Sequence, residues 1–257
     1  MNALAMLRHQ LRYDVLTMTR SRQARLWTIF MPVMMLVLFA AIFGNQMTGA
    51  GPGMVRSSTY YVANLSAFAV VDAAFMTLAV ALVIQREQGI LKRRRATPEP
   101  AWVVLVSRAL TGALTSIVLA SVLLTFGHFV YGASVPLRVL PALAATVVVG
   151  TLAMCGLGFA ATTMVNRAEA AQPLVMAATM PLFFASGIFI PWALIPHWLR
   201  NVALVTPIRH LASAMLLPFS SRTGAGWSPG DLLVVALWGL AGVAVAARRF
   251  RWSPSVA

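Results

Sequence analysis

The sequence predicts an all-α membrane protein with six transmembrane helices. Of its 257 residues, 60% are hydrophobic and only 10% are charged, and the mean hydropathy is +0.80. About a quarter of the residues of a soluble domain are charged, so these few could not cover a water-facing surface. The apolar residues also gather into blocks near the length of about 20 residues with which a helix crosses a bilayer.

The apolar blocks, taken in chain order, define the predicted spans. The spans lie at 26–44, 59–84, 101–131, 139–165, 173–191 and 232–247. About 25 residues precede the first block, too many for the charged region of a signal peptide, so we expect this span to be retained. We therefore expect a cytoplasmic element over 1–25 and a transmembrane domain over 26–257.

The basic residues favour alternate sides of the membrane. The side predicted to be cytoplasmic holds Arg8, Arg12, Arg20, Arg22, Arg25, Arg86, Lys92, Arg93, Arg94, Arg95, Arg167, Arg248, Arg249 and Arg251. The opposite loops hold Arg56, Arg138, Arg200, Arg209 and Arg222. Because Lys and Arg are enriched in cytoplasmic loops, we expect both termini in the cytoplasm and the chain in the cytoplasmic membrane. Orientation and anionic headgroups then explain the net charge of +14, with no nucleic acid as partner.

The first 25 residues predict a basic amphipathic helix. Leu4, Leu7 and Leu11 fall on one helical face, and Arg8 and Arg12 fall on the others. Such a helix lies on the inner leaflet with its apolar face in the headgroup region. Either it is anchored there without a protein partner, or it borders a subunit interface.

The segment QREQGILKRRRATPEP after the second span is expected to form a short helix across the membrane face. Arg86 and Glu87 leave the span, and Gly89 permits a sharp change of direction. An apolar patch of Ile90 and Leu91 follows, and Thr97-Pro98 restarts the chain toward the third span. A loop that only touches lipid phosphates explains the basic run, whereas a helix offering Glu87 and the patch to a cytosolic partner explains the whole segment.

Residues 196–219 are hydrophobic enough to suggest a seventh span, which their polar content argues against. Arg200 and Arg209 would each cost roughly 2.5–3.5 kcal/mol near the bilayer centre. The prolines Pro191, Pro196 and Pro207 also divide the segment into short pieces. We expect re-entrant or interfacial helices over 191–219 on the outer side.

Asp72 is the one acidic residue deep inside a predicted span. An intramembrane carboxyl marks a transport pathway, a proton relay or a buried pair. The structural alternative is that it bonds helix hydroxyls or pairs with Arg108 or His128 on the third span.

Small residues on the third and fourth spans predict close helix packing. Gly112, Ser116 and Ala120 form a ridge on the third, and Gly150, Gly156 and Gly158 lighten the fourth. Packing within the bundle and a seam between subunits both remain open.

The sequence gives no support for catalysis by this chain. It contains no G-x-S-x-G elbow, no H-E-x-x-H pair, no Cys/His metal spacing and no phosphate-binding G-x-x-x-x-G-K-[ST] loop. We therefore expect neither an enzyme nor a metal or cofactor on this chain.

Taken in order, these features resemble the permease subunits of type-2 ABC exporters, including drug-resistance and polysaccharide or lipid-export permeases. The matching features are the amphipathic first helix, the acidic-x-Gly element with its basic run and Thr-Pro, and the phrase FFASGIFIPWALIPHWLRNVALVTPIRHLASAML. Two departures occur: Ile90 stands where many members have Thr or Ser, and Thr206-Pro207 replaces the commoner Asn-Pro.

The resemblance implies partners and roles for these segments. Residues 86–98 would be the coupling helix, seated on a separately encoded ATPase that carries ATP and Mg²⁺, and the first helix would be the interface helix beside it. Two ATPase copies and a second permease, identical or paralogous, would complete an exporter of a drug, lipid or glycolipid. Asp72, Gly187, Pro191, Pro196 and Pro207 would belong to the translocation path and its re-entrant exit.

Two other function classes stay open from the sequence. One is a stand-alone secondary transporter that couples to protons through Asp72, although the internal repeats and paired broken helices of such proteins are not evident. The other is an intramembrane enzyme, for which the motifs are missing.

Overall fold

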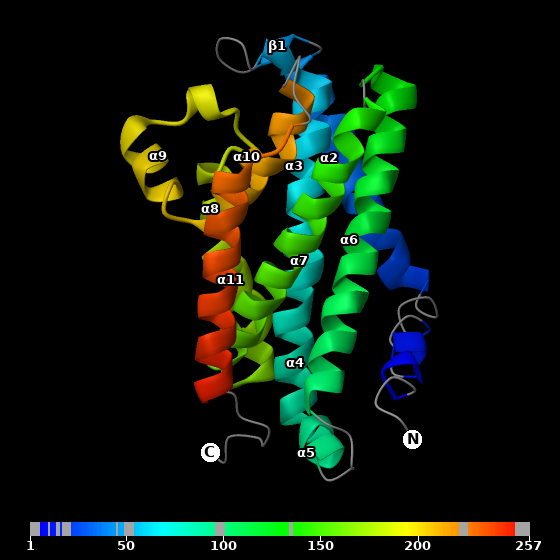
Figure 1. Ribbon diagram of the computed structural model, residues 1–257, viewed down its shortest axis with the longest axis vertical. Coiled ribbons are helices and arrows are strands. Elements are labelled where there is room, and N and C mark those ends of the chain that lie inside the picture. Colours follow the sequence, from blue (N-terminus) through cyan, green and yellow to red (C-terminus); the bar gives the residue numbers. More distant parts are fainter. Residues whose placement is uncertain are drawn as a thin grey trace.

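The computed structural model describes residues 6–9, 11–13, 16, 22–44, 46–48, 54–95, 101–133, 136–220 and 226–249. These residues form an elongated helical bundle with one short hairpin (Figure 1). The hairpin and the end of α10 lie at one end of the bundle, and α5 and the end of α11 lie at the other (Figure 1). The all-α membrane fold predicted from composition is confirmed.

The elements follow one another with short connections. They are α2 (Arg22–Phe43), β1 (Met47–Thr48), β2 (Val55–Arg56), α3 (Ser57–Val71), a π-helical turn (Asp72–Met76), α4 (Thr77–Glu87), α5 (Ile90–Arg95), α6 (Ala101–Tyr131), a 3-10 turn (Leu137–Val139), α7 (Leu140–Thr162), α8 (Ala168–Ala185), a 3-10 turn (Trp192–Leu194), α9 (His197–Ala203), α10 (Pro207–Ser220) and α11 (Pro229–Arg249). In the hairpin, Met47 pairs with Arg56 in antiparallel register.

The centre of the bundle is a continuous helical rod from Ser57 to Glu87, made of α3, the π-turn and α4. Every residue of α3 is buried, because α2, α6, α7 and α10 surround it. At about 1.5 Å per residue, the 31 residues reach about 46 Å, longer than the hydrocarbon core of about 30 Å. The rod therefore links the two ends of the molecule.

The backbones of α7 and α11 touch along a stripe of glycines. A Cβ atom at Gly156 would lie 2.6 Å from the Gly239 carbonyl oxygen, and one at Gly242 would lie 2.7 Å from that of Gly156. Small residues allow such approach where lipid gives helices no hydrophobic drive to associate. Gly156 thus serves packing within the bundle.

The ridge on α6 also faces inward for most of its length. Ser116 is fully buried, and a Cβ at Gly112 would meet Ala74 and Thr151 at 3.6–3.7 Å, an ordinary contact distance. Gly158 fits against the π-turn, since its Cβ would lie 3.3 Å from the Ala74 carbonyl oxygen. Packing within the chain is the reading that these contacts support.

Among the described residues, four helices are long and apolar enough to cross a membrane. They are Ser57–Glu87, Val106–Tyr131, Leu137–Thr162 and Pro229–Arg249, which match the second, third, fourth and sixth predicted spans. A fifth crossing results if α9 and α10, which meet at 94°, are counted as one broken span. The first predicted span contains a shorter apolar helix, Ile29–Phe43, within α2. The chain is thus a multi-pass membrane protein, and the count of six stays a prediction.

The fifth predicted span, 173–191, differs from the helix that forms. Helix α8 begins at Ala168 after the extended Arg167 and ends at Ala185. Gly187 has a φ of +92°, in the left-handed region that glycine tolerates, so the chain turns out of the helix there. The boundary prediction missed this turn because 186–190 are as apolar as the helix before them.

Candidate functional site

The junction of α4 and α5, here called the elbow, is built around Gly89. Helix α4 ends at Glu87, and the Gly89 amide donates to the Arg86 carbonyl oxygen at 3.0 Å. The φ of Gly89 is +70°, which costs roughly 1–2 kcal/mol for a residue with a Cβ. The glycine therefore allows α5 to leave the rod in a new direction, as the sequence predicts.

Arg86 points into the protein rather than toward its surface. Its side chain is only 4% exposed and donates to the carbonyl oxygen of Thr162, at 2.9 Å, and to that of Val165. The last carbonyls of a helix have no partner within it and carry partial negative charge. Arg86 therefore caps the end of α7.

Glu87 complements this contact at the next helix. Its carboxylate accepts a hydrogen bond from the amide of Ala168, the first residue of α8. A helix N-terminus presents unpaired amides and a partial positive charge, so a carboxylate is stabilised there. Arg86 and Glu87 together form a clip, here called the Arg86–Glu87 clip, that joins the elbow to the α7–α8 turn.

The remaining coupling residues divide between the core and the surface. Leu91 is 1% exposed and belongs to the main hydrophobic core, while Ile90 is half-buried. Lys92 and Arg93 are exposed at the start of α5. The apolar patch predicted for a partner is thus mostly used within the chain, and Thr97 and Pro98 lie outside the described residues.

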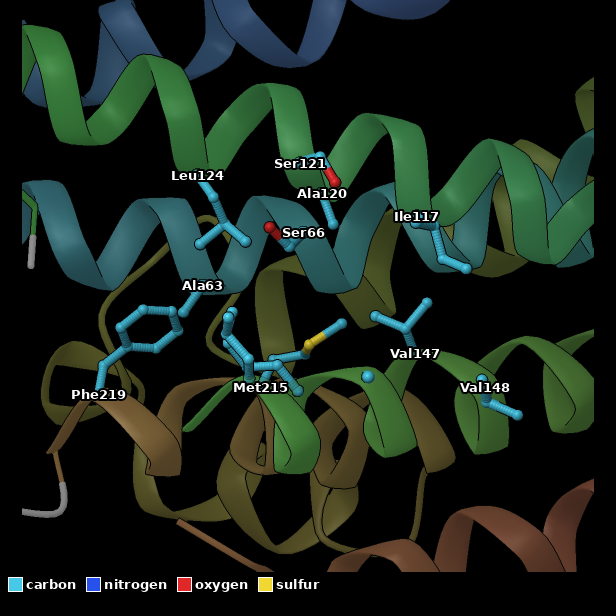
Figure 2. A pocket seen from close by; sticks show the side chains of 13 residues that line it. Ala63, Ser66, Ile117, Ala120, Ser121, Leu124, Val147, Val148, Met215 and Phe219 are labelled. Atoms are coloured by element: carbon cyan, nitrogen blue, oxygen red, sulfur yellow. The ribbon is translucent and has the colours of Figure 1, made fainter. Parts of the chain in front are cut away.

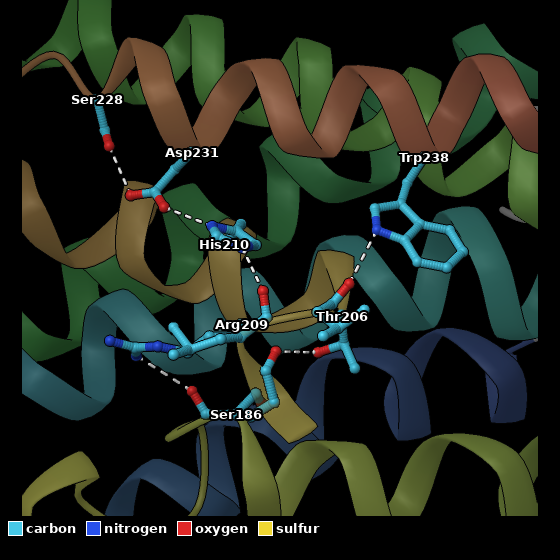
Figure 3. Close-up of polar contacts among 10 residues, drawn as sticks. Ser186, Thr206, Arg209, His210, Ser228, Asp231 and Trp238 are labelled. Atoms are coloured by element: carbon cyan, nitrogen blue, oxygen red, sulfur yellow. Dashed lines mark hydrogen bonds and ion pairs between the residues drawn. The ribbon is translucent and has the colours of Figure 1, made fainter. Parts of the chain in front are cut away.

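At the opposite end, the turn after α8 is held by α3 and α10. The hydroxyl of Tyr60 donates to the Gly187 carbonyl oxygen. Figure 3 shows that Arg209 donates to the Ser186 carbonyl oxygen, at 3.2 Å. The Arg209 guanidinium lies 3.7 Å from the Trp192 ring centroid, a cation–π contact. Gly187 is one of the residues that the sequence predicts for the exit, whereas its contact with Tyr60 has no signal in the sequence.

The bend between α9 and α10, at 204–206, is here called the outer hinge, and α11 holds it. Trp238 on α11 donates from Nε1 to the Val205 carbonyl oxygen at 3.0 Å. His210 reaches Asp231 with Nδ1 at 2.7 Å and the Leu204 carbonyl oxygen with Nε2 at 2.9 Å (Figure 3). Both ring nitrogens therefore contact oxygen atoms, one on α11 and one at the bend itself.

The predicted prolines begin short helices rather than only separating them. Pro191 and Pro196 precede the 3-10 turn and α9, with φ values of −51° and −58°, and Pro207 is the first residue of α10. Proline suits the first turn of a helix because its missing amide has no partner there anyway. The segment is broken into short helices as expected.

Asp72 stands apart from both ends. It begins the π-turn, a feature that is frequent at functional sites, and is half-buried. Tyr60 precedes it by 12 residues and Arg86 follows it by 14, so each lies about 20 Å away along the rod. In the part of the chain that the structure describes, its carboxylate has no hydrogen bond or ion pair, and His128 bonds the Ala133 carbonyl oxygen at 3.0 Å instead.

The described part of the first helix has the predicted polarity. Leu7 and Leu11 are half-buried in helical backbone, and Arg8 and Arg12 are exposed. Leu4 lies outside the described residues. No group of three His, Cys, Asp or Glu residues able to hold a metal ion occurs in the described ranges.

Sequence reasoning also missed Trp238 and the pairing of Asp231 with His210. The chain has only six acidic residues and four histidines, so an acid at the start of a span and a histidine in a preceding hydrophobic segment are a usable signal. No periodicity of the sequence pairs His210 with Asp231, because they are 21 residues apart and belong to different helices.

Comparison with known proteins gives the family. The family model described as "ABC-2 type transporter" matches residues 7–219. The chain is 25% identical over 152 residues to "Probable multidrug ABC transporter permease YbhR" of Escherichia coli K12, covering 59% of this chain and 41% of that protein. It is 22% identical over 194 residues to "Putative transport permease YvfS" of Bacillus subtilis 168, covering 76% of this chain and 77% of that one.

The family match spans the elbow, the π-turn and the outer hinge, so it includes most of the geometry described above. The relatives are named as permeases, which agrees with a polytopic bundle that is a transporter component. The chain belongs to the ABC-2 type transporter family and is a type-2 ABC permease.

Proposed function

We propose that this chain is the membrane-spanning subunit of an ATP-driven exporter and forms half of the translocation path. The observation that carries the proposal is the rod Ser57–Glu87, which has Tyr60 bound to the turn after α8 at one end and the Arg86–Glu87 clip at the other. A displacement of α5 would move the rod and, through the clip, α7 and α8. A movement of the elbow can thereby be transmitted along the rod to the turn after α8, which Arg209 of α10 also contacts.

The proposed energy source is a separate ATPase that binds ATP and Mg²⁺. Members of the family work with ABC ATPase subunits, and we infer two copies under two permeases, identical or paralogous. Lys92 and Arg93 are exposed at the start of α5 and offer positive charge to such a partner. Arg86 and Glu87 then act by holding the elbow in position.

The proposed topology has six spans in the cytoplasmic membrane, with both termini in the cytoplasm. Helices α2 and α8, of 22 and 18 residues, serve as the first and fifth spans, reaching about 33 Å and 27 Å. The first helix lies on the inner leaflet beside the elbow, and α9 and α10 are re-entrant on the outer side. The 94° bend at the outer hinge supports this reading, because neither piece is long enough to cross alone.

The proposed substrate class is hydrophobic or amphipathic: a drug, a lipid or a glycolipid. One relative is named a probable multidrug permease, and many side chains of the described bundle that point outward are apolar. The exit of the proposed translocation path is shaped by Gly187 and by the prolines Pro191, Pro196 and Pro207. These assignments rest on the family and on the apolar character of the bundle.

The test is co-expression with candidate ABC ATPase subunits and co-purification, followed by substrate-stimulated ATP hydrolysis in proteoliposomes. Reversing the charge of α5 with Lys92→Glu and Arg93→Glu should abolish recovery of the ATPase while leaving membrane insertion intact. The matched control is Arg56→Glu at the opposite end of the rod, which should bind the ATPase as the unaltered chain does. ATPase binding that survives the α5 reversal would refute the proposed docking surface.

A second candidate is a stand-alone proton-coupled transporter, which is favoured by the Asp72 carboxylate at the π-turn, because no described residue pairs with it. It requires that the purified chain alone drive uptake into vesicles under a pH gradient, and that Asp72→Asn abolish this uptake. If transport instead requires ATP and the partner ATPase, Asp72 lines the proposed translocation path and is not a proton relay.

A further inference from the structure

A recess of about 240 Å³ lies between α3, α6, α7 and α10 (Figure 2), and none of its lining residues belongs to the elbow or the outer hinge. All its lining side chains are apolar except those of Ser66 and Ser121. The Ser66 hydroxyl donates to the Val62 carbonyl oxygen at 2.8 Å, so its hydrogen is already bonded within α3. The recess is therefore a place for hydrocarbon and not for a polar ligand.

Small residues on three helices create the recess. Ala63 on α3, Ala120 on α6 and Ala144 on α7 face it. Ala120 continues the ridge of Gly112 and Ser116, whose other members pack tightly within the bundle. Where the ridge meets alanines instead of larger side chains, space is left between the helices.

The recess opens sideways onto the membrane. Ile117 and Val148 line it and are 46% and 45% exposed on the outer faces of α6 and α7. Both helices are candidate membrane spans, so the medium at this mouth is hydrocarbon. The inner wall is closed by Met215, which is 1% exposed. Water finds few hydrogen-bond partners in such an apolar space, whereas an apolar cavity of about 150 Å³ is already large enough to bind benzene.

The shape of the recess matches one extended chain. Its lining runs from Leu140 to Val148 along α7 and from Ile117 to Leu124 along α6, which is about 10–12 Å in each case. This long axis follows the helices, the direction in which lipid tails lie. The exposed Arg138 stands two residues before Leu140 and supplies positive charge at that end.

We propose that this recess binds one acyl chain of an anionic membrane phospholipid, with the headgroup at the Arg138 end. The bound chain contacts Met215 and Phe219 of α10, so it supports the helix that follows the outer hinge. A second copy of the protein fits less well, because the recess is a narrow opening between helices and not a broad face. The inference does not depend on the transported substrate or on the ATPase.

The test uses the purified full chain in vesicles that contain a phosphatidylglycerol with a photo-activatable diazirine midway along one tail. After irradiation, mass spectrometry locates the labelled peptides. We expect labels to concentrate on 117–124, 140–148 and 215–219 rather than on the other outward-facing helices. The variant Ala144→Phe fills the recess and should lower this labelling about tenfold, the effect of losing the burial of about two methylene groups.

The matched control is Leu152→Phe, which adds an aromatic ring on the exposed face of the same helix and should leave labelling unchanged. Ala120→Leu is a second and smaller filling substitution, to be used if Ala144→Phe lowers the thermal unfolding midpoint. Labels spread evenly over all apolar faces, or undiminished in a folded filling variant, would overturn the proposal. So would crosslinks at these peptides between two copies of the chain.

Discussion

His210 on α10 and Asp231 on α11 are joined by a hydrogen bond, with 2.7 Å between Nδ1 and Oδ1, that holds the outer hinge against the last helix. The Asp231 carboxylate also accepts a hydrogen bond from the Ser228 hydroxyl at 2.6 Å, and this second bond holds the carboxylate in the orientation that contacts His210. The bend at 204–206 is therefore set by contacts to α11 as well as by Pro207.

Removing this carboxylate should loosen the outer hinge. We expect Asp231→Ala to lower the free energy of unfolding by about 1–2 kcal/mol, a value reduced by the partial exposure of the pair. Amide hydrogen exchange at 204–210 should accelerate. Ser228→Ala, which keeps the pair, is the control, and equal exchange in the two variants would show that the pair does not hold the hinge.

The Arg86–Glu87 clip predicts a large effect from one buried cation. Arg86→Ala leaves the Thr162 and Val165 carbonyl oxygens without their donor, so unfolding should become easier by about 2–4 kcal/mol. Hydrogen exchange at 162–168 reports the loss locally. The exposed Arg93→Ala should change stability by less than about 0.5 kcal/mol. A stable Arg86→Ala protein with unchanged exchange would contradict the assignment.

The elbow depends on the left-handed backbone of Gly89. Gly89→Ala meets no steric contact within 4 Å, so its cost is conformational, roughly 1–2 kcal/mol. We expect the altered direction of α5 to reduce ATPase-driven transport more than it reduces expression. Gly230→Ala also has open space but a helical backbone, and it should be neutral or slightly stabilising. Equal transport by the two variants would mean that the direction of α5 is not important.

The link between the rod and the turn after α8 is tested by a pair of tyrosines. Tyr60→Phe removes the donor to the buried Gly187 carbonyl oxygen and should cost about 1–2 kcal/mol. Tyr61→Phe is matched in size, and its hydroxyl is 3.4 Å from the Phe189 carbonyl oxygen, a weak bond whose loss should cost less. Thermal unfolding in detergent distinguishes the two, and the reverse order would argue against the Tyr60 link.

Sequence reasoning succeeded where the signal is local. Four predicted spans are helices that meet the length and hydropathy of a crossing, because apolar runs and charged interruptions are read along the chain itself. Gly89 and Pro207 were recognised as turning points since backbone geometry depends on the residue itself. The family resemblance rested on the order of such local features, and the family match agrees with it.

The roles of the clip and the outer hinge were decided only by the tertiary structure. The sequence placed Arg86 and Glu87 in the predicted coupling segment, but it did not show that Arg86 bonds to a carbonyl 76 residues away or that Glu87 bonds to an amide 81 residues away. Asp231 was passed over because its histidine is on another helix. Hydropathy and periodicity describe which face of a helix is apolar, but they do not state which helix lies against it. The partners of buried polar groups, which must be satisfied, depend on that packing.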